Sequence, residues 1–237
     1  MNYFCESLWA IFVKDVVTEF RSKQTLPTMI VLGMLIVWIM RIVSESISAG
    51  VAVMAPAVLW IAFLFSGLLT QERSFAVEEH ADCMSGLLLA PVDPGTIYIA
   101  KLLVNIIMLC VFEIVVVPVV FLAFQVNVGS RWLEFIIVLL LGNIGISSVG
   151  TLFSAVIGLA RTRGSLLSII VLVILMPMMI PATFALLQLF NAIPTEVAGT
   201  GTLAFVGTLD TAVGYMIAFD AVFVVACWLL FGFIIKE

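Results

Sequence analysis

Residues 140–182 have the sequence LLGNIGISSVGTLFSAVIGLARTRGSLLSIIVLVILMPMMIPA, and this stretch decides the fold class of the chain. Two apolar runs flank the short basic segment at residues 161–164, and each belongs to a segment long enough for a membrane-spanning helix of about 20 residues. Small residues are frequent in the first run, and two prolines interrupt the second. The pattern predicts two helices that cross a bilayer and are joined by a loop on the side where arginine gathers.

The composition of the whole chain also indicates a membrane protein. Of its 237 residues, 64% are hydrophobic and 11% are charged, whereas soluble domains carry about 25% charged residues. The apolar residues occur in long runs, unlike the weak alternating pattern of a β-barrel. Six runs qualify as spans, at residues 27–43, 51–70, 102–124, 134–158, 165–190 and 215–235. We therefore expect one all-α transmembrane domain over residues 1–237, with a six-helix bundle at 26–237.

The distribution of lysine and arginine predicts the orientation of the spans. Eight basic residues would share one side: Lys14, Arg21, Lys23, Arg73, Lys101, Arg161, Arg163 and Lys236. Only Arg41 and Arg131 would lie on the other side. This excess places both termini in the cytoplasm, as an even number of spans requires.

Residues 1–25 are expected to form an amphipathic helix along the cytoplasmic membrane surface. On a helical wheel, its apolar face holds Cys5, Trp9, Phe12, Val13, Val16 and Phe20. Its polar face holds Ser7, Lys14, Asp15, Thr18, Arg21 and Ser22. Pro27 and the polar segment at 21–24 favour a bend before the first span over a straight cytosolic extension of that span.

The loop after the second span, residues 71–101, concentrates acidic residues and the only histidine of the chain. Its candidates for contact with a soluble partner are Glu72, Arg73, Glu78, Glu79, His80 and Asp82. We expect a short helix at 74–85, stopped by Gly86. From these residues alone, a solvated connection and a docking surface are equally compatible. A metal site is disfavoured, because the candidates at 78–82 cannot all share one helical face.

Small residues and prolines mark the fourth and fifth spans. Gly150, Ser154 and Gly158 are spaced four apart and form a stripe for close helix packing, either within the bundle or toward another subunit. Pro177 and Pro181 remove backbone donors from the fifth span and predict a kink. The kink is either a fixed bend or a hinge.

Two carboxylates interrupt apolar spans. Glu113 lies within the third span, where an ionisable side chain is costly and suggests a functional site. Asp220 lies nearer the outer end of the sixth span, where the penalty is smaller. Glu113 is therefore the stronger candidate for an intramembrane role.

The sequence lacks the usual motifs of catalysis. It has no GxxxxGK[ST] phosphate loop, and its single histidine cannot build a Ser-His-Asp set or an HExxH zinc site. Its four cysteines lack the spacing of a metal or disulfide set. We expect neither an enzyme nor a metal site, so active transport would take its energy from a partner or from an ion gradient.

Two stretches resemble the haem exporter protein B (CcmB) family of cytochrome c maturation. They are LLTQERSFAVEEHADCMSGLLLAPVDPGTIYIAKLL at residues 68–103 and the stretch at 140–182 quoted above. The short first span after a basic N-terminus is also similar. More broadly, an amphipathic helix, six spans and a charged loop after the second resemble the membrane subunits of type-2 ABC exporters. The segment at 82–87 departs from the family pattern, and residues 191–214 match nothing in it.

The resemblance implies the permease subunit of an ABC transporter in c-type cytochrome biogenesis, in the bacterial inner membrane. It implies several partners: two copies of a cytoplasmic ATPase docked on the loop at 71–101, a second copy of this chain, haem-handling membrane subunits and a periplasmic haem chaperone. ATP would bind only to the ATPase, and haem would be handled within the complex. Hydrolysis would drive haem export or release of the haem-loaded chaperone. The alternatives are a gradient-driven transporter that uses Glu113 and a non-transporting scaffold.

Overall fold

The computed structural model of the chain describes residues 2–22, 24–45, 51–80, 93–160, 165–192 and 207–234. In chain order its helices are α1 (Asn2–Ser22), α2 (Thr25–Ser44), α3 (Val51–His80), α5 (Pro94–Phe124), α6 (Trp132–Ala160), α7 (Ser165–Leu189) and α9 (Leu209–Ile234). The six helices from α2 to α9 are long and apolar enough to cross a membrane. The predicted all-α fold with six spans is confirmed.

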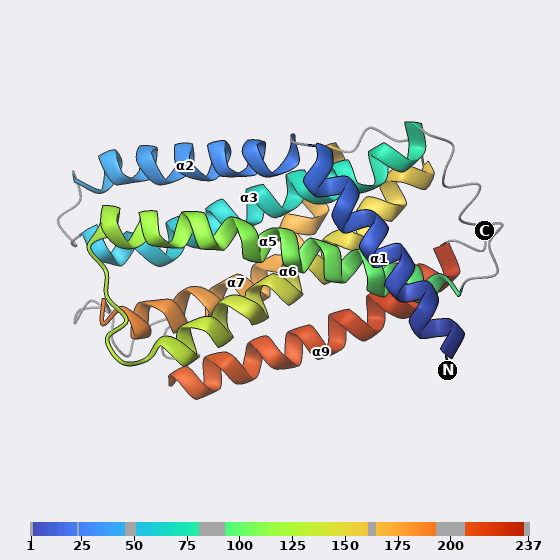
Figure 1. The fold of residues 1–237 in the computed structure, drawn as a ribbon. Coiled ribbons are helices and arrows are strands. Elements are labelled where there is room, and N and C mark those ends of the chain that lie inside the picture. The colour runs from blue at the N-terminus through green and yellow to red at the C-terminus, as the bar shows by residue number, and fades with distance from the viewer. Residues whose placement is uncertain are drawn as a thin grey trace.

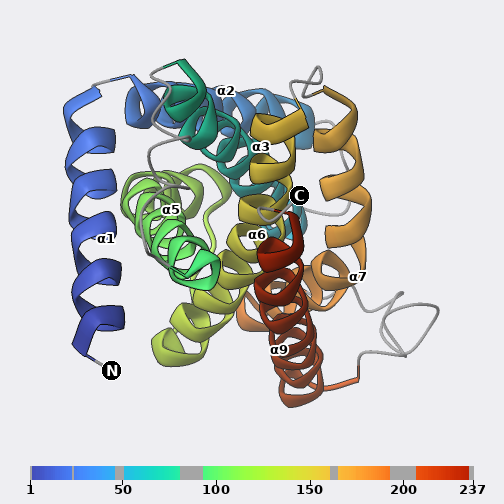
Figure 2. The same ribbon diagram turned by 90° about the vertical axis from the view of Figure 1, so that its right-hand side faces the viewer.

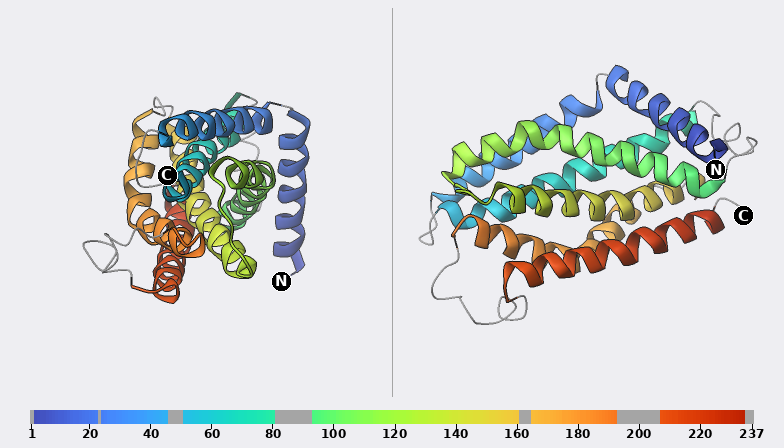
Figure 3. Two further views of the ribbon diagram at one scale, coloured as in Figure 1. Left: turned by 90° about the vertical axis from the view of Figure 1, so that its left-hand side faces the viewer. Right: turned by 60° about the horizontal axis from the view of Figure 1, so that its bottom comes forward.

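The six spans run side by side, and α1 lies across one end of them (Figure 1). The start of α1 and the end of α9 lie at this same end of the bundle, as an even number of spans requires. Figure 3 shows from two further directions that α1 stays outside the bundle, where it packs on α5. The polar ends of α3 and α5 lie near α1, whereas the turn from α5 to α6 lies at the opposite end.

Helix α6 is the centre of the bundle, with α3, α5, α7 and α9 packed around it (Figure 2). The share of buried residues is 72% in the α6 span but only 17% in α2 and 22% in α9, so α6 is the span most removed from lipid. Its glycines make room for large neighbours: the Trp60 indole of α3 fills the space beside Gly142, and Met178 of α7 fills the space beside Gly145. Such close contacts are what holds helices together in lipid.

Contacts near the middle and at the C-terminal end of α2 fix it to the bundle. Gly33 faces the ring of Phe112 on α5, and that ring stacks edge-on with Phe63 of α3 at 5.7 Å between centroids. Near the C-terminal end of α2, the Arg41 Nε donates a hydrogen bond of 2.6 Å to the Ala123 carbonyl at the end of α5. The acceptor is one of the carbonyls that a helix end leaves without an intrahelical donor.

The amphipathic helix is present, but one residue of its expected polar face is buried. Trp9, Val13 and Val17 are exposed on α1, on the side away from the bundle. Asp15 is 9% exposed, faces α5, and pairs with the buried Lys101 at 3.4 Å between Nζ and Oδ2. The wheel could not reveal this, because the partner that buries Asp15 lies on a different helix.

Two helix ends differ from the expected limits. Helix α3 continues without a break to His80, in place of a separate short helix at 74–85. The reason is that no glycine or proline falls between residues 68 and 85 to stop it. Helix α5 begins at Pro94 and not at residue 102, because proline suits the first helical turn and lacks the donor that this turn leaves unused. Residues 81–92 lie outside the described ranges.

We predict that Asp15→Asn loosens α1 from α5. The change removes the negative charge that faces the buried Lys101, at a cost of about 3 kcal/mol, the lower end for a broken buried ion pair. Unfolding in detergent should occur at a lower Tm, and limited proteolysis should cut α1 faster. Glu6→Gln makes the same chemical change at an exposed position of α1 and should alter neither. Equal behaviour of the two variants would show that the ion pair does not hold α1.

Candidate functional site

The candidate coupling residues lie on the part of α3 that continues beyond the membrane span. The apolar span of this helix covers Val51–Leu69, and the helix ends at His80. Residues 70–80 therefore extend the helix by roughly 16 Å, at about 1.5 Å per residue. The extension carries Glu72, Arg73, Glu78, Glu79 and His80. Asp82 lies outside the described residues.

Gln71 anchors the base of this extension to α6. Its side chain is 2% exposed, and its Nε2 donates a hydrogen bond of 3.1 Å to the Ile146 carbonyl. Gly150 faces the Gln71 amide so closely that an added Cβ would overlap it. One turn earlier, Gly67 packs against the Ile146 side chain. The base of the α3 extension is thus anchored to the central helix.

Sequence reasoning did not single out Gln71. It directly follows the second span, and a glutamine at the end of a span is ordinarily assigned to the hydrated boundary between membrane and water. The one signal lay in α6, where Gly150 belongs to the stripe of small residues that allows close helix packing. Neither position indicates the other in the sequence, because α3 and α6 are separated by an entire span.

The small-residue stripe of α6 faces the interior of the chain where it is described. Gly150 packs on Gln71 of α3, as above. Ser154 is 3% exposed, and its hydroxyl donates to the Thr151 carbonyl of its own helix at 3.0 Å. Thr151 in turn accepts a 2.8 Å hydrogen bond from Asn105 of α5. Gly158 lies in the last turn of α6, outside the part of this helix whose packing the structure describes.

The hinge candidates lie in a helix that continues through both of them. Helix α7 includes Pro177 and Pro181 without interruption. Pro177 is exposed on the outside of the bundle, whereas Pro181 is buried. Met178, between them, is fully buried against Gly145 of α6. The proline segment therefore touches the central helix through a methionine, a flexible side chain that fits irregular spaces.

Both intramembrane carboxylates approach α6, but from different sides. Glu113 of α5 is 9% exposed and lies beside Asn143 of α6. Asp220 of α9 is 6% exposed and lies beside Gly145, where an added Cβ would come within 2.8 Å of its Oδ1. Positions two apart on a helix point in nearly opposite directions. The two acids are thus separated by the body of α6.

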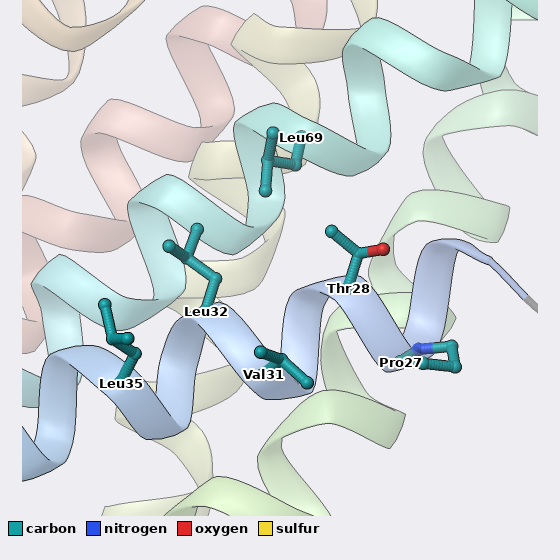
Figure 4. Close-up of a pocket in the computed structure, with 6 residues that line it drawn as sticks. All are labelled: Pro27, Thr28, Val31, Leu32, Leu35 and Leu69. Atoms are coloured by element: carbon teal, nitrogen blue, oxygen red, sulfur yellow. The ribbon is translucent and has the colours of Figure 1, made fainter.

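An apolar groove of about 420 Å³ lies between α2 and α3 (Figure 4). Its lining residues are Pro27, Thr28, Val31, Leu32, Leu35 and Leu69. The only polar side chain among them, Thr28, already donates its hydroxyl to the Gln24 carbonyl at 2.7 Å. A ligand site normally adds a few polar groups that orient the ligand, so this groove suits acyl chains better than a specific ligand. Across the described ranges, no three acidic, histidine or cysteine side chains form a metal-binding group.

The chain matches a known protein family over most of its length. The sequence profile of the family described as CcmB protein matches residues 6–227, nearly the whole chain. A comparison with individually curated proteins gave no match. The matched range includes most of the amphipathic helix, the α3 extension and five complete spans, and it extends into α9.

We predict that Gly150→Ala disturbs the anchor of the α3 extension. The new methyl group would occupy the place of the Gln71 amide and force it from the Ile146 carbonyl, an overpacking cost of about 1–3 kcal/mol. The Tm in detergent should fall by about 2–4 °C for each kcal/mol. Gly214→Ala on α9 is the matched control, since its added Cβ would meet nothing within 4 Å. An equal fall in both variants would contradict the proposed anchor.

Proposed function

Since the chain belongs to the CcmB protein family, the permeases of haem export in cytochrome c maturation, we propose that its α3 extension couples a partner ATPase to the bundle. Family membership and the six spans make the chain a multi-pass membrane subunit of an ABC transporter in c-type cytochrome biogenesis. The proposal adds the place and the means of coupling. It rests on one observation: the acidic extension and the second span form a single helix.

A continuous helix carries a displacement from one end to the other. Movement of an ATPase bound at residues 72–80 would shift α3 as a rigid element, because the helix contains no break between extension and span. The Gln71 hydrogen bond and the Gly67 and Gly150 contacts would pass the shift to α6. Helix α6 packs against α5, α7 and α9, so the shift would reach most of the bundle. Rigid-body movement of packed helices is a common form of such transitions.

We propose that ATP binds to the partner, since the sequence has no phosphate loop of its own. Two copies of the ATPase would be needed for a complete transporter. Hydrolysis would drive haem export or release of a haem-loaded periplasmic chaperone. Haem itself would be held within the complex, with haem-handling membrane subunits.

The proposed orientation places the α1 end of the bundle in the cytoplasm of a bacterial inner membrane. Lys14 and Lys101 lie at the end that carries α1 and the α3 extension. Arg41 and Arg131 lie at the opposite end, where Arg41 contacts the end of α5 and Arg131 precedes α6. Cytoplasmic lysine and arginine are the usual determinants of orientation. The α3 extension would then meet a cytoplasmic ATPase.

The spans least covered by the chain itself are proposed to meet other membrane subunits. Helices α2 and α9 have the lowest buried shares. Exposed apolar side chains cover both, including Trp38 on α2 and Trp228 on α9. A second copy of this chain and the haem-handling subunits are the partners proposed for these faces, with lipid on the rest.

The buried Glu113 keeps a gradient-driven transporter as the second candidate function. That function predicts transport without any ATPase and its loss in Glu113→Gln. A scaffold that does not transport would keep its function when the partner can no longer hydrolyse ATP. Cytochrome c maturation measured with an ATPase variant deficient in hydrolysis separates these two from the proposed function.

We predict that the double reversal Glu78→Lys/Glu79→Lys weakens binding of the ATPase at least about tenfold, or about 1.4 kcal/mol. The reversal should replace attraction to the partner with repulsion while the spans still insert. The measurement is titration of the purified ATPase onto the chain in lipid nanodiscs, together with co-purification from membranes.

The matched control reverses two carboxylates at the other end of the bundle, Glu134→Lys with Asp210→Lys. Glu134 forms only an exposed ion pair with Arg131 in the described structure, so its loss should cost little. ATPase binding should remain at the wild-type level. If the reversal at Glu78 and Glu79 leaves binding unchanged as well, the α3 extension is not the docking site.

A further inference from the structure

Three buried oxygen atoms between α5 and α6 have no hydrogen-bond partner within the described chain. They are Glu113 Oε1, Asn143 Oδ1 and Ser147 Oγ. Asn143 and Ser147 are fully buried, and Glu113 is 9% exposed. In the apolar core of a membrane, such groups are strongly destabilising unless something satisfies them.

These residues occupy one interface. Asn143 and Ser147 are four apart on α6 and therefore share a face. That face meets α5, because Asn143 lies beside Glu113 and its Nδ2 donates to the Cys110 sulfur at 3.6 Å. One turn beyond Ser147, Thr151 accepts the hydrogen bond from Asn105 of α5. A line of polar side chains thus runs along the α5–α6 contact, and its middle is unsatisfied.

The carboxylate in this line lacks a counter-charge. No ion pair joins Glu113 to a basic side chain in the described ranges, whereas Asp15, Glu45 and Glu134 each have such a partner. A carboxylate without a counter-charge at this depth is strongly disfavoured. The atoms are also too enclosed for a lipid headgroup or a side chain of another subunit to reach. A partner for these atoms must therefore be small.

We propose that Glu113, Asn143 and Ser147 form an intramembrane binding site for a small monovalent cation, either a proton or Na⁺. A carboxylate, an amide carbonyl and a hydroxyl are the oxygen ligands that hard cations prefer. One carboxylate balances one positive charge, which favours a monovalent ion over Ca²⁺ or Mg²⁺. Occupancy would bring ligands from α5 and α6 onto one ion and strengthen the contact between these helices.

Asp220 provides a comparison within the same chain. It is a buried carboxylate whose two oxygens both lack a hydrogen-bond partner within the described chain, and it lies across α6 beside Gly145 and Met178. No amide or hydroxyl oxygen accompanies it there among the contacts described. The other titratable group that faces Glu113 is the Cys110 thiol on α5. The site is therefore assigned to Glu113 and not to Asp220.

Dicyclohexylcarbodiimide, which modifies carboxyl groups in apolar surroundings, tests the site directly in the purified complex. Mass spectrometry should locate the adduct on Glu113. If Na⁺ is the occupant, NaCl should slow labelling at least about fivefold relative to choline chloride. This factor is expected once the Na⁺ concentration reaches about four times the Kd of the site. If a proton is the occupant, labelling should fall with rising pH and ignore Na⁺. An unlabelled Glu113, or a rate that neither cation changes, overturns the proposal.

Thermal unfolding of variants gives the second test. Binding of the cation to this site should raise the Tm of the wild-type chain by about 2–4 °C. Asp220→Asn should keep this response, and Glu113→Gln should lose it. Should Glu113→Gln fail to fold, Ser147→Ala removes one oxygen ligand with little change of shape and should reduce the response. Equal responses in the wild type, Ser147→Ala and Glu113→Gln would overturn the proposal.

Discussion

The structure depends on how closely other helices can approach α6. Lipid provides no hydrophobic force between spans, so they associate through packing and hydrogen bonds. Helix α6 meets this constraint with glycines at the points where Trp60, Met178 and Gln71 come closest. These side chains come from α3 and α7, so a single helix sets the distances of its neighbours. The arrangement of the polar groups follows from the same contacts, because Asn143 and Ser147 reach α5 only at close range.

This centre links two features that are far apart in the membrane. The α3 extension is fixed to α6 by Gln71 at the α1 end, and Glu113 meets α6 within the bilayer. The α3 extension and Glu113 therefore both contact the same helix, α6. A displacement of α6 that accompanied ATPase movement would alter the distance between Asn143 and Glu113. Coupling between the α3 extension and Glu113 would then require only that α6 adopt two alternative positions.

The sequence was sufficient for the spans and for the amphipathic first helix, because the length and periodicity of apolar runs reflect the bilayer directly. It was insufficient for helix ends, since an apolar run does not show how far a helix continues into water; α3 reaches His80 for this reason. It indicated Glu113 by its charge. It did not indicate Gln71, because a glutamine at the end of a span is ordinarily assigned to the solvated boundary. It did not indicate Asn143 or Ser147, because a polar residue among glycines has the same pattern whether it packs or binds. Asp82, Arg161 and Arg163 lie outside the described structure, so their roles stay predictions.

The ion pair between α1 and α5 has a consequence for the order of assembly during synthesis. Asp15 and Lys101 are 86 residues apart in the chain. Asp15 leaves the ribosome long before its partner and must wait, hydrated at the membrane surface, until two spans have inserted. The first helix to be made is thus locked in place only when the third span, α5, begins to form. A chain whose early spans insert in the wrong direction would carry Lys101 to the far side, leaving α1 undocked and open to cytosolic proteases.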